Sequence, residues 1–581
     1  MLDIADNMVH IVPMYIEAVP NRSSPPAILL REGHRKNGKV IKKTLANLSD
    51  WSKDRIETFR RFLKGEPLVS VDDVFRIVRT FPHGHVEAVL GTMRKVGLDG
   101  ILSSRPCPER NLVVAMIAER LIHPGSKLAN TRSWQQSSLA AELGVGDATT
   151  EDLYSALDWL FDRQPRIEAK LAKRHLKDGA LVLYDTSTSF YTGRTCPLAK
   201  YGHDRDRSGF PIIAYGVMTD ARGCPVAVEI YPGNTGDPKT VPDQVDKLTN
   251  RFSLASVVVV GDRGMLTQTQ IDTLKKREGL AWISCLRSPA IRALIRNGEV
   301  ERSLFDEKNL AEIASPDFPG ERLVACFNPF LADERKRKRE DLLRMTEKHL
   351  EGLVREVKRR KKKLLGKAEI GVKAGKVLGR YKMGKHFLLT IGENSFEWKR
   401  REEAILQETQ LDGIYVIRTS VPKEKLSADD AVRTYKSLSM VERAFRCLKG
   451  VDLLVRPIHH RNENRVRAHI FLCMLAYYVE WHMRQALAPI LFHDDELEAN
   501  RKTRDPVAPA ESSSSAKRKK RVKKTEDGLI IQSFKDLIAD LGTRAKNLCR
   551  FGAGPDAPTI TRITEMTPLQ SKAFELLQLS Q

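Results

Sequence analysis

Residues 256–264 read Ser-Val-Val-Val-Val-Gly-Asp-Arg-Gly. Four consecutive valines favour a β-strand, because β-branched side chains pack well on a buried pleated surface. Asp262 follows this strand directly. A second apolar stretch, Leu-Val-Leu-Tyr at residues 181–184, is followed in the same way by Asp185. The sequence therefore predicts two buried strands, each with an aspartate at its carboxyl end.

The segments around these two strands indicate an α/β fold. Strands are predicted at residues 180–184, 211–218, 225–230, 256–261 and 280–286, and helices at 241–251 and 268–277. The turn Asp-Ala-Arg-Gly joins the second strand to the third. Hairpin strands followed by β-α-β units imply a mixed sheet with helices packed against it.

The two aspartates are candidate metal ligands. If their strands lie side by side in parallel, Asp185 and Asp262 come to one edge of the sheet, where α/β proteins place their sites. Close carboxylates repel each other unless a cation lies between them, and carboxylate oxygens suit hard ions such as Mg²⁺. The alternative is that each aspartate only caps the turn after its strand, because aspartate is favoured in turns.

Glu442 is the best candidate for a third acid, because of its place on a predicted helix. At 100° per residue, one apolar stripe of this helix consists of Leu438, Val441, Phe445 and Leu448. A polar stripe along its edge consists of Tyr435, Glu442, Arg446 and Lys449. A glutamate at the border of a buried face can point into a cleft, where Arg446 and Lys449 would bind phosphate. The alternative is an ordinary surface pair of Glu442 with Arg446.

Composition bounds the class of protein. The 581 residues contain 97 lysines and arginines against 74 acids, a net charge of +23, which favours a polyanionic partner. The eight cysteines are scattered without a Cys-x-x-Cys pair and are interpreted as reduced thiols of a cytosolic protein. The apolar helical run at 470–479 is too short to span a bilayer. No Gly-x₄-Gly-Lys-[Ser/Thr] motif is present, which argues against an ATP-driven motor.

Changes in pattern divide the chain into seven predicted regions. They are a small β-rich module at 1–50, a helical DNA-binding region at 51–177, the first part of the α/β core at 178–288, an insertion with a long basic helix at 289–412, the last part of the core at 413–497, a basic, serine-containing linker at 498–527 and a small helical tail at 528–581. Long helices are predicted at 335–363, 428–449 and 465–487.

Several basic or histidine-containing segments have two interpretations. The runs 358–363 and 517–521 are either solvated or add sequence-independent affinity for DNA. His459 and His460 follow a predicted turn at Arg456-Pro457 and belong either to a phosphate contact or to a solvated loop.

Taken with its motifs, the sequence resembles the DDE transposases of the IS4 superfamily, and most closely the IS1634 family of bacterial insertion sequences. The IS4-type signature is Tyr, two residues, Arg, three residues, Glu, six residues, Lys, and Tyr435, Glu442 and Lys449 stand at those positions. Leu438 replaces the arginine, which leaves its phosphate-binding role unfilled or passes it to Arg443 or Arg446. Further similarity lies at 201–203, 209–216, 231–237 and 262–264, although Leu266 stands where an aromatic residue is often found.

The resemblance implies an RNase H-like core with an inserted α+β region, preceded by the β module and the helical region. Asp185, Asp262 and Glu442 would be the catalytic and metal-binding triad for two Mg²⁺ (or Mn²⁺) ions. Tyr435, Arg446 and Lys449 would bind DNA phosphate. The partners would be double-stranded DNA, both terminal inverted repeats and target, and a second copy in a homodimer, in the cytoplasm at the bacterial nucleoid and away from membranes.

Two other functions are compatible with the same residues. A metal-dependent nuclease would use this core without strand transfer. A decayed or domesticated protein would bind DNA without catalysis, but three acidic residues at the metal-ligand positions argue against it. Short inverted repeats flanking the gene would favour transposition.

Overall fold

The valine stretch forms the predicted strand in the computed structural model. Strand β8 (Val257–Val260) pairs in parallel with β5 (Ala180–Phe190) on one side and with β9 (Leu280–Cys285) on the other. Three of its four valines are buried, as expected for a strand in the interior of a sheet whose faces are both covered. The structure describes residues 11–22, 24–36, 39–66, 75–193, 195–450, 452–552 and 557–579.

The central strands have the order of an RNase H-like core. Strand β6 (Ile212–Thr219) is antiparallel to β5, and β7 (Pro225–Pro232) is antiparallel to β6. The order β7-β6-β5-β8-β9, with β6 reversed, confirms the predicted mixed sheet. Three more antiparallel strands extend it to eight, with β14 (Ile414–Thr419) next to β9, then β11 (Arg322–Phe327) and β10 (Leu310–Ile313).

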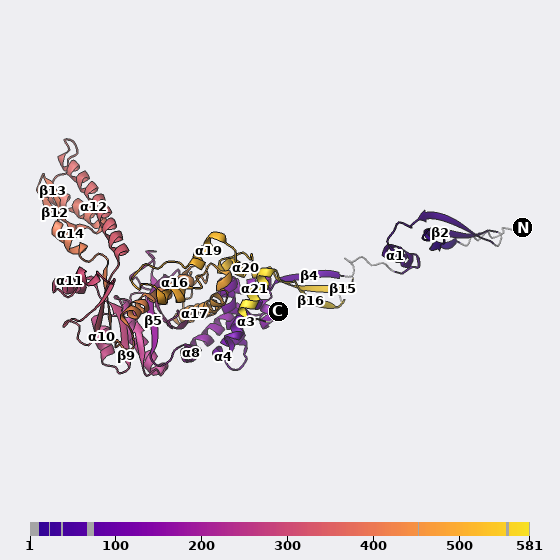
Figure 1. Ribbon diagram of the computed structural model, residues 1–581, viewed down its shortest axis with the longest axis horizontal. Helices are drawn as coiled ribbons and strands as arrows, with labels where there is room; N and C mark the ends of the chain where they lie inside the picture. The colour runs from indigo at the N-terminus through magenta and orange to yellow at the C-terminus, as the bar shows by residue number, and fades with distance from the viewer. Residues whose placement is uncertain are drawn as a thin grey trace. The chain divides into compact units, whose positions relative to one another are not determined.

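The segment between β9 and β14 has two parts. Strands β10 and β11 join the main sheet, with α11 (Ser288–Arg296) packed in a small apolar cluster beside them. The long helices α12 (Pro329–Lys358) and α13 (Lys367–Tyr381) pack with the hairpin β12 (Phe387–Ile391) and β13 (Phe396–Arg400) around a separate core (Figure 1). The long charged helix is confirmed, but it begins and ends earlier than predicted. Helix α14 (Glu402–Thr409) leads back to β14.

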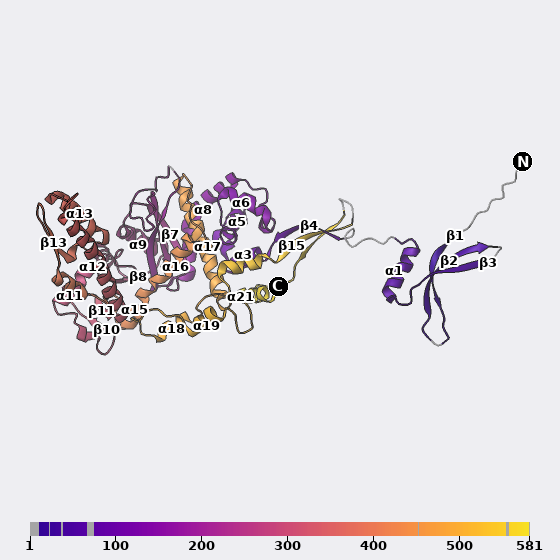
Figure 2. The same ribbon diagram turned by 90° about the horizontal axis from the view of Figure 1, so that it is seen from above.

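Helices build the rest of the main core. Helices α5 (Pro108–Ile122), α8 (Thr150–His175) and α17 (Glu463–Ala486) pack on one another, and both α8 and α17 contact β7 (Figure 2). Helix α17 is buried on almost every side, which explains its apolar composition. Within the part of the chain that the structure describes, no helix has both the length and the apolar character that crossing a membrane requires.

The predicted helix at 428–449 is two helices, so that expectation is wrong. Helix α15 (Ala428–Lys436) ends at Ser437, and α16 (Leu438–Lys449) begins directly after it. The Ser437 hydroxyl donates to the Arg433 carbonyl oxygen at 3.1 Å, and the Arg501 guanidinium contacts the same carbonyl. Both groups compete with the backbone hydrogen bonds of a continuous helix.

The chain divides into two compact units, and the smaller one is formed by Met1–Thr80 with Lys546–Ile563. Strands β1 (Ile11–Val19), β2 (Ala27–Lys36) and β3 (Lys39–Asn47) form an antiparallel sheet, as predicted, followed by α1 (Lys53–Leu63). The dipeptide Asn37-Gly38, which predicts a turn within this module, lies outside the described residues. A second sheet has the order β16-β15-β4, from Phe75–Pro82 (β4), Ala545–Phe551 (β15) and Thr559–Ile563 (β16).

The C-terminal part is more ordered than its composition indicates. The stretch predicted to be a linker, 498–527, contains most of α18 (Leu497–Thr503) and all of α19 (Ser514–Val522). Lys519 of α19 is buried, and its Nζ donates to the Ala488 carbonyl oxygen at 2.9 Å. The tail contains β15 and β16 besides α20 (Phe534–Gly542) and α21 (Pro568–Leu577). All eight cysteines are free thiols and seven are buried, as predicted.

Candidate active site

The two predicted aspartates lie at the same level of neighbouring parallel strands. Leu183 of β5 pairs with Val260 of β8. Asp185 lies two residues beyond Leu183, and Asp262 lies two residues beyond Val260. The sheet register therefore places both carboxyl groups at one edge of the β5–β8 pair.

The Asp185 carboxyl group is buried beside other acids. Its pKa is raised to about 7, mainly by burial and to a smaller extent by the negative charges of Asp262 and Asp237. The positive charge of Arg205 and the backbone N–H of Thr186, which donates to Asp185 Oδ1 at 2.8 Å, act in the opposite direction. A bound cation would stabilise the ionised form of such a buried carboxyl group beside other acids.

Asp262 also caps the turn that follows its strand. Its Oδ1 accepts hydrogen bonds from the backbone N–H groups of Gly264 at 3.0 Å and Met265 at 2.7 Å. The turn-capping interpretation is therefore correct for this oxygen. The cap also fixes the direction of the carboxylate, which a preorganised metal ligand needs.

Two charged residues of this site were not predicted. Arg205, from the loop between β5 and β6, donates to the Thr186 carbonyl oxygen at 2.6 Å and to Asp237 Oδ2 at 3.2 Å. Asp237 Oδ1 accepts from the Thr186 hydroxyl at 2.6 Å. Both belong to or adjoin segments of family similarity, at 231–237 and 201–203, but only the folded chain shows that they meet beside Asp185.

Glu442 lies on the exposed edge of α16. The helix packs its apolar face against β5 and β6, where the rings of Phe445 and Tyr215 meet at 5.8 Å. Lys449 follows Glu442 by seven residues, or about two turns, so both share one edge of the helix. Lys449 Nζ lies 3.6 Å from Asp206 Oδ2, and the charge of the adjacent Arg205 contributes to lowering its pKa, after burial. This edge of α16 therefore borders the loop that reaches Asp185.

Tyr435 lies near Asp262, the aspartate that follows β8. Burial raises the pKa of its phenol, and the charge of Asp262 raises it further, so the ring lies close to this aspartate. Tyr435 belongs to α15, and Glu442 and Lys449 belong to α16. The predicted stripe thus comes from two helices joined at Ser437.

The three positions considered for the missing arginine differ in their surroundings. Leu438 is 9% exposed and packs in the main core. Arg443 donates to His493 Nδ1 at 3.1 Å and lines a cavity together with Trp481. Arg446 is exposed and follows Glu442 by four residues, so it lies on the same side of α16.

Comparison with protein families agrees with this arrangement. The family model described as the transposase DDE domain matches residues 186–479, just over half of the chain. The chain belongs to this DDE transposase family. Asp262 and Glu442 lie inside the match, and Asp185 immediately precedes it. A comparison with curated proteins finds no match.

Membership of the DDE family makes the chain an enzyme of the transposase and nuclease type. Such proteins act on DNA, and the family generally uses divalent metal ions. The acid-rich edge of β5 and β8 has the hard oxygen ligands that Mg²⁺ and Mn²⁺ prefer.

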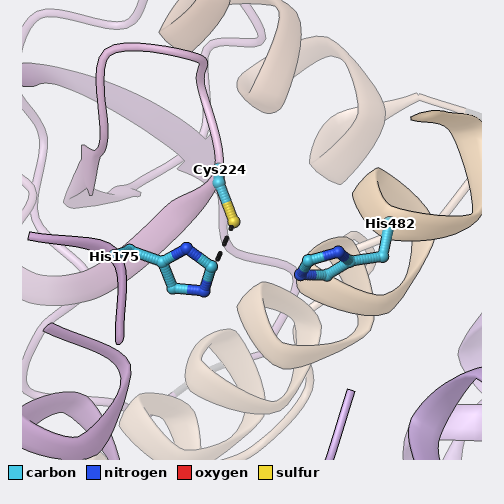
Figure 3. A group of neighbouring side chains, drawn as sticks. All are labelled: His175, Cys224 and His482. Atoms are coloured by element: carbon cyan, nitrogen blue, oxygen red, sulfur yellow. Dashed lines mark hydrogen bonds between the residues drawn. The ribbon is translucent and has the colours of Figure 1, made fainter. Parts of the chain in front are cut away.

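Among the described residues of this transposase, two other groups of side chains have metal-binding residue types. His175, Cys224 and His482 bring their ligand atoms within 4.8 Å of one another (Figure 3). However, His175 Nε2 is hydrogen-bonded to the Tyr478 hydroxyl at 3.0 Å, and its Nδ1 lies 4.0 Å from Asp220. Burial raises the pKa of Cys224 and disfavours the thiolate that binds metal. The arrangement fits a buried hydrogen-bonded cluster.

The second group is Cys447, Asp452 and Glu480. Arg484 already neutralises its acids, since its Nε donates to Glu480 at 2.5 Å and its other nitrogen lies 3.2 Å from Asp452. A guanidinium therefore occupies the place of a cation there. The aspartates of β5 and β8 remain the better metal ligands.

Proposed function

We propose that this protein is an insertion-sequence transposase of the IS4 superfamily, closest to the IS1634 family, that cuts and joins DNA at the ends of its element. The observation that carries the proposal is the pair Asp185 and Asp262 on adjacent parallel strands, with the Asp185 pKa raised to about 7 by burial and neighbouring acids. The family match and the RNase H-like strand order support the same chemistry.

In this proposal, Asp185, Asp262 and Glu442 hold the metal ions. Two bound Mg²⁺ or Mn²⁺ ions would supply an activated oxygen nucleophile and stabilise the leaving oxygen. Lys449 and Arg446 bind the phosphate beside Glu442, and Tyr435 positions it next to Asp262. Arg205 holds Thr186 and Asp237 in place, so that Asp185 keeps its direction.

The partners in this proposal are double-stranded DNA and a second copy of the chain. Residues 1–177, the β-rich module together with the helical region, would recognise the terminal repeats, and the net charge of +23 would add affinity that does not depend on sequence. Two copies would hold two ends together during strand transfer.

The test is strand cleavage and joining on a plasmid that carries the DNA flanking the gene on both sides. Glu442→Gln keeps the size of the side chain and removes its charge, so it should lower both activities by several orders of magnitude, as expected when a metal ligand is lost. Asp185→Asn and Asp262→Asn should do the same. Excess EDTA should abolish the activity of the unmodified protein.

Glu403→Gln is the matched control, because Glu403 is an exposed glutamate on α14. It should retain full activity, and all variants should bind DNA in EDTA as the unmodified protein does. Full activity of Glu442→Gln would remove Glu442 from the site. Cleavage without any joined product would contradict transposition and indicate a nuclease.

A further inference from the structure

A cavity of about 440 Å³ lies among α5, α6 (Lys127–Ser133), α8 and the segment that leads into α17. We call it the basic cavity. Among its lining residues, all within the described chain, there are five lysines and arginines, three histidines and no aspartate or glutamate. The basic residues are Arg120, Lys127, Arg456, Arg461 and Arg465. Such a lining attracts an anion.

Lys127 is the most unusual of these residues. It is 4% exposed, and its Nζ finds no hydrogen-bond partner among the described residues. Burial and the charge of Arg120 lower its pKa to about 7. Arg120 itself donates to backbone carbonyl oxygens, including Gly125 at 2.9 Å and Leu454 at 3.1 Å. Two buried cations without an acid are costly unless an anion binds between them.

Two of the other three cations at the cavity have acidic partners. Arg456 pairs with Asp206 at 2.7 Å, and Arg465 pairs with Asp158 at 2.9 Å. The third, Arg461, is exposed to solvent. The buried charge that lacks compensation therefore lies around Lys127 and Arg120.

Residues that line the basic cavity, or adjoin its lining, make hydrogen bonds and ion pairs with elements of the candidate active site. His459 Nδ1 lies 3.1 Å from the hydroxyl of Thr192, and the Tyr191 hydroxyl donates to the His460 carbonyl oxygen at 3.1 Å. Both partners directly follow β5, the strand of Asp185. On the other side, Asp206 is shared by Arg456 and Lys449. One wall of the cavity thus contacts the end of β5, which carries Asp185, and is linked through Asp206 to α16, which carries Glu442.

We propose that the basic cavity binds a backbone phosphate of the DNA strand that is held at Asp185 and Asp262, and that the Lys127 ammonium pairs with this phosphate. The inference rests on the proposed function, because it takes DNA as the substrate. Inorganic phosphate has the same chemistry, so the experiment separates the two sources. The same proposal places His459 and His460 at a phosphate-binding site, because both line the basic cavity.

Lys127→Met in the full-length protein is the main test, because it keeps an apolar stem and removes the charge. Binding to a fluorescent DNA duplex is measured by anisotropy in EDTA at several salt concentrations. The Kd should rise about tenfold or more, and the slope of log K against log salt should fall by about 1. The Tm should rise, because an unpaired buried charge is removed.

Lys535→Met is the matched control, since Lys535 is exposed on α20, lies outside the proposed recognition region and does not line the cavity. It should leave the Kd within about twofold. An equal loss in both variants, or an unchanged Kd in a folded Lys127→Met protein, would overturn the proposal. If Lys127→Met does not fold, Arg461→Gln at the exposed mouth decides: a weaker Kd supports the proposal and an unchanged one overturns it.

Sodium phosphate distinguishes the two sources of the anion. It should raise the Tm of the unmodified protein, leave that of Lys127→Met unchanged, and compete with DNA more strongly than chloride does at equal ionic strength. A rise in Tm without this competition would assign the cavity to a free anion and overturn the DNA assignment. Because every measurement is made without metal, a failure of the catalytic proposal does not affect these outcomes.

Discussion

Ionisation of the buried Asp185 carboxyl group lowers the stability of the folded protein, and metal binding should remove this effect. Its pKa is raised from 3.8 to about 7 in the folded protein. An acid with a raised pKa stabilises the fold fully below its unfolded pKa, and this contribution is lost as the pH rises through the folded pKa. Metal-free Asp185→Asn should therefore have a higher Tm than the unmodified protein at pH 8. The difference should shrink as the pH falls from 8 to 5, as measured by thermal melts in EDTA.

Millimolar Mg²⁺ should raise the Tm of the unmodified protein and leave Asp185→Asn unchanged, because a ligand stabilises the state that binds it. Asp272→Asn is the control, since Asp272 is exposed on α10 (Gln268–Lys275). It should show neither effect. If the Tm difference between Asp185→Asn and the unmodified protein does not change with pH, the pKa of Asp185 is not raised by folding, which would contradict this prediction.

Individual residues differ in how far the sequence predicts them. Asp185 and Asp262 could be found because each directly follows an apolar stretch, which is a local pattern. The prediction that both lie at the carboxyl end of a strand is wrong for Asp185, because β5 continues past it to Phe190. Arg205 and Lys127 could not be found in this way. Arg205 acts through Thr186 and Asp237, and Lys127 is notable only because the fold buries it near Arg120. No spacing rule encodes such tertiary neighbours.

At the scale of elements, the positions of Arg443 and Arg446 on α16 indicate which of them takes the role of the signature arginine, whose position is occupied by Leu438. Arg446 and Glu442 are one turn apart on the exposed side, whereas Arg443 points toward His493. Arg446→Gln should therefore lower strand cleavage by about 10- to 100-fold, the size of effect expected for a lost transition-state charge contact. Arg443→Gln, on the same helix, should stay within about threefold. Equal losses in single-turnover cleavage would show that position on the helix does not decide the role.

The elements themselves could be predicted where their pattern is local. The RNase H-like strands were found because each has its own apolar run and turn. Strand β4 was missed because its sheet partners, β15 and β16, come from the other end of the chain. The break between α15 and α16 was missed because a contact from Arg501 contributes to it. Helix α19 was missed because its basic composition is typical of a solvated linker. The structure buries Lys519 of this helix, and an ion pair with Asp495 at 3.0 Å compensates its charge.

At the scale of the whole molecule, the smaller unit carries an excess of basic charge in its N-terminal part. Residues 11–66 contain twelve lysines and arginines against six acids, a net charge of +6. The main core cluster begins only at Val86. Strand β3 presents mostly exposed side chains, including Lys42 and Lys43. These features are typical of a module that contacts DNA rather than one that supports catalysis.

Deleting residues 1–66 should therefore separate recognition from chemistry. The main thermal transition should change little, because the main core is retained. The Kd for DNA carrying the element ends should approach that for random DNA, and the salt dependence of binding should become shallower, since fewer phosphates are neutralised. Metal-dependent cleavage should persist at low salt without preference for the ends. If the truncated protein folds and still prefers the ends, the helical region from residue 75 onward contains the recognition surface. Competition anisotropy at matched salt with end and random duplexes measures the difference.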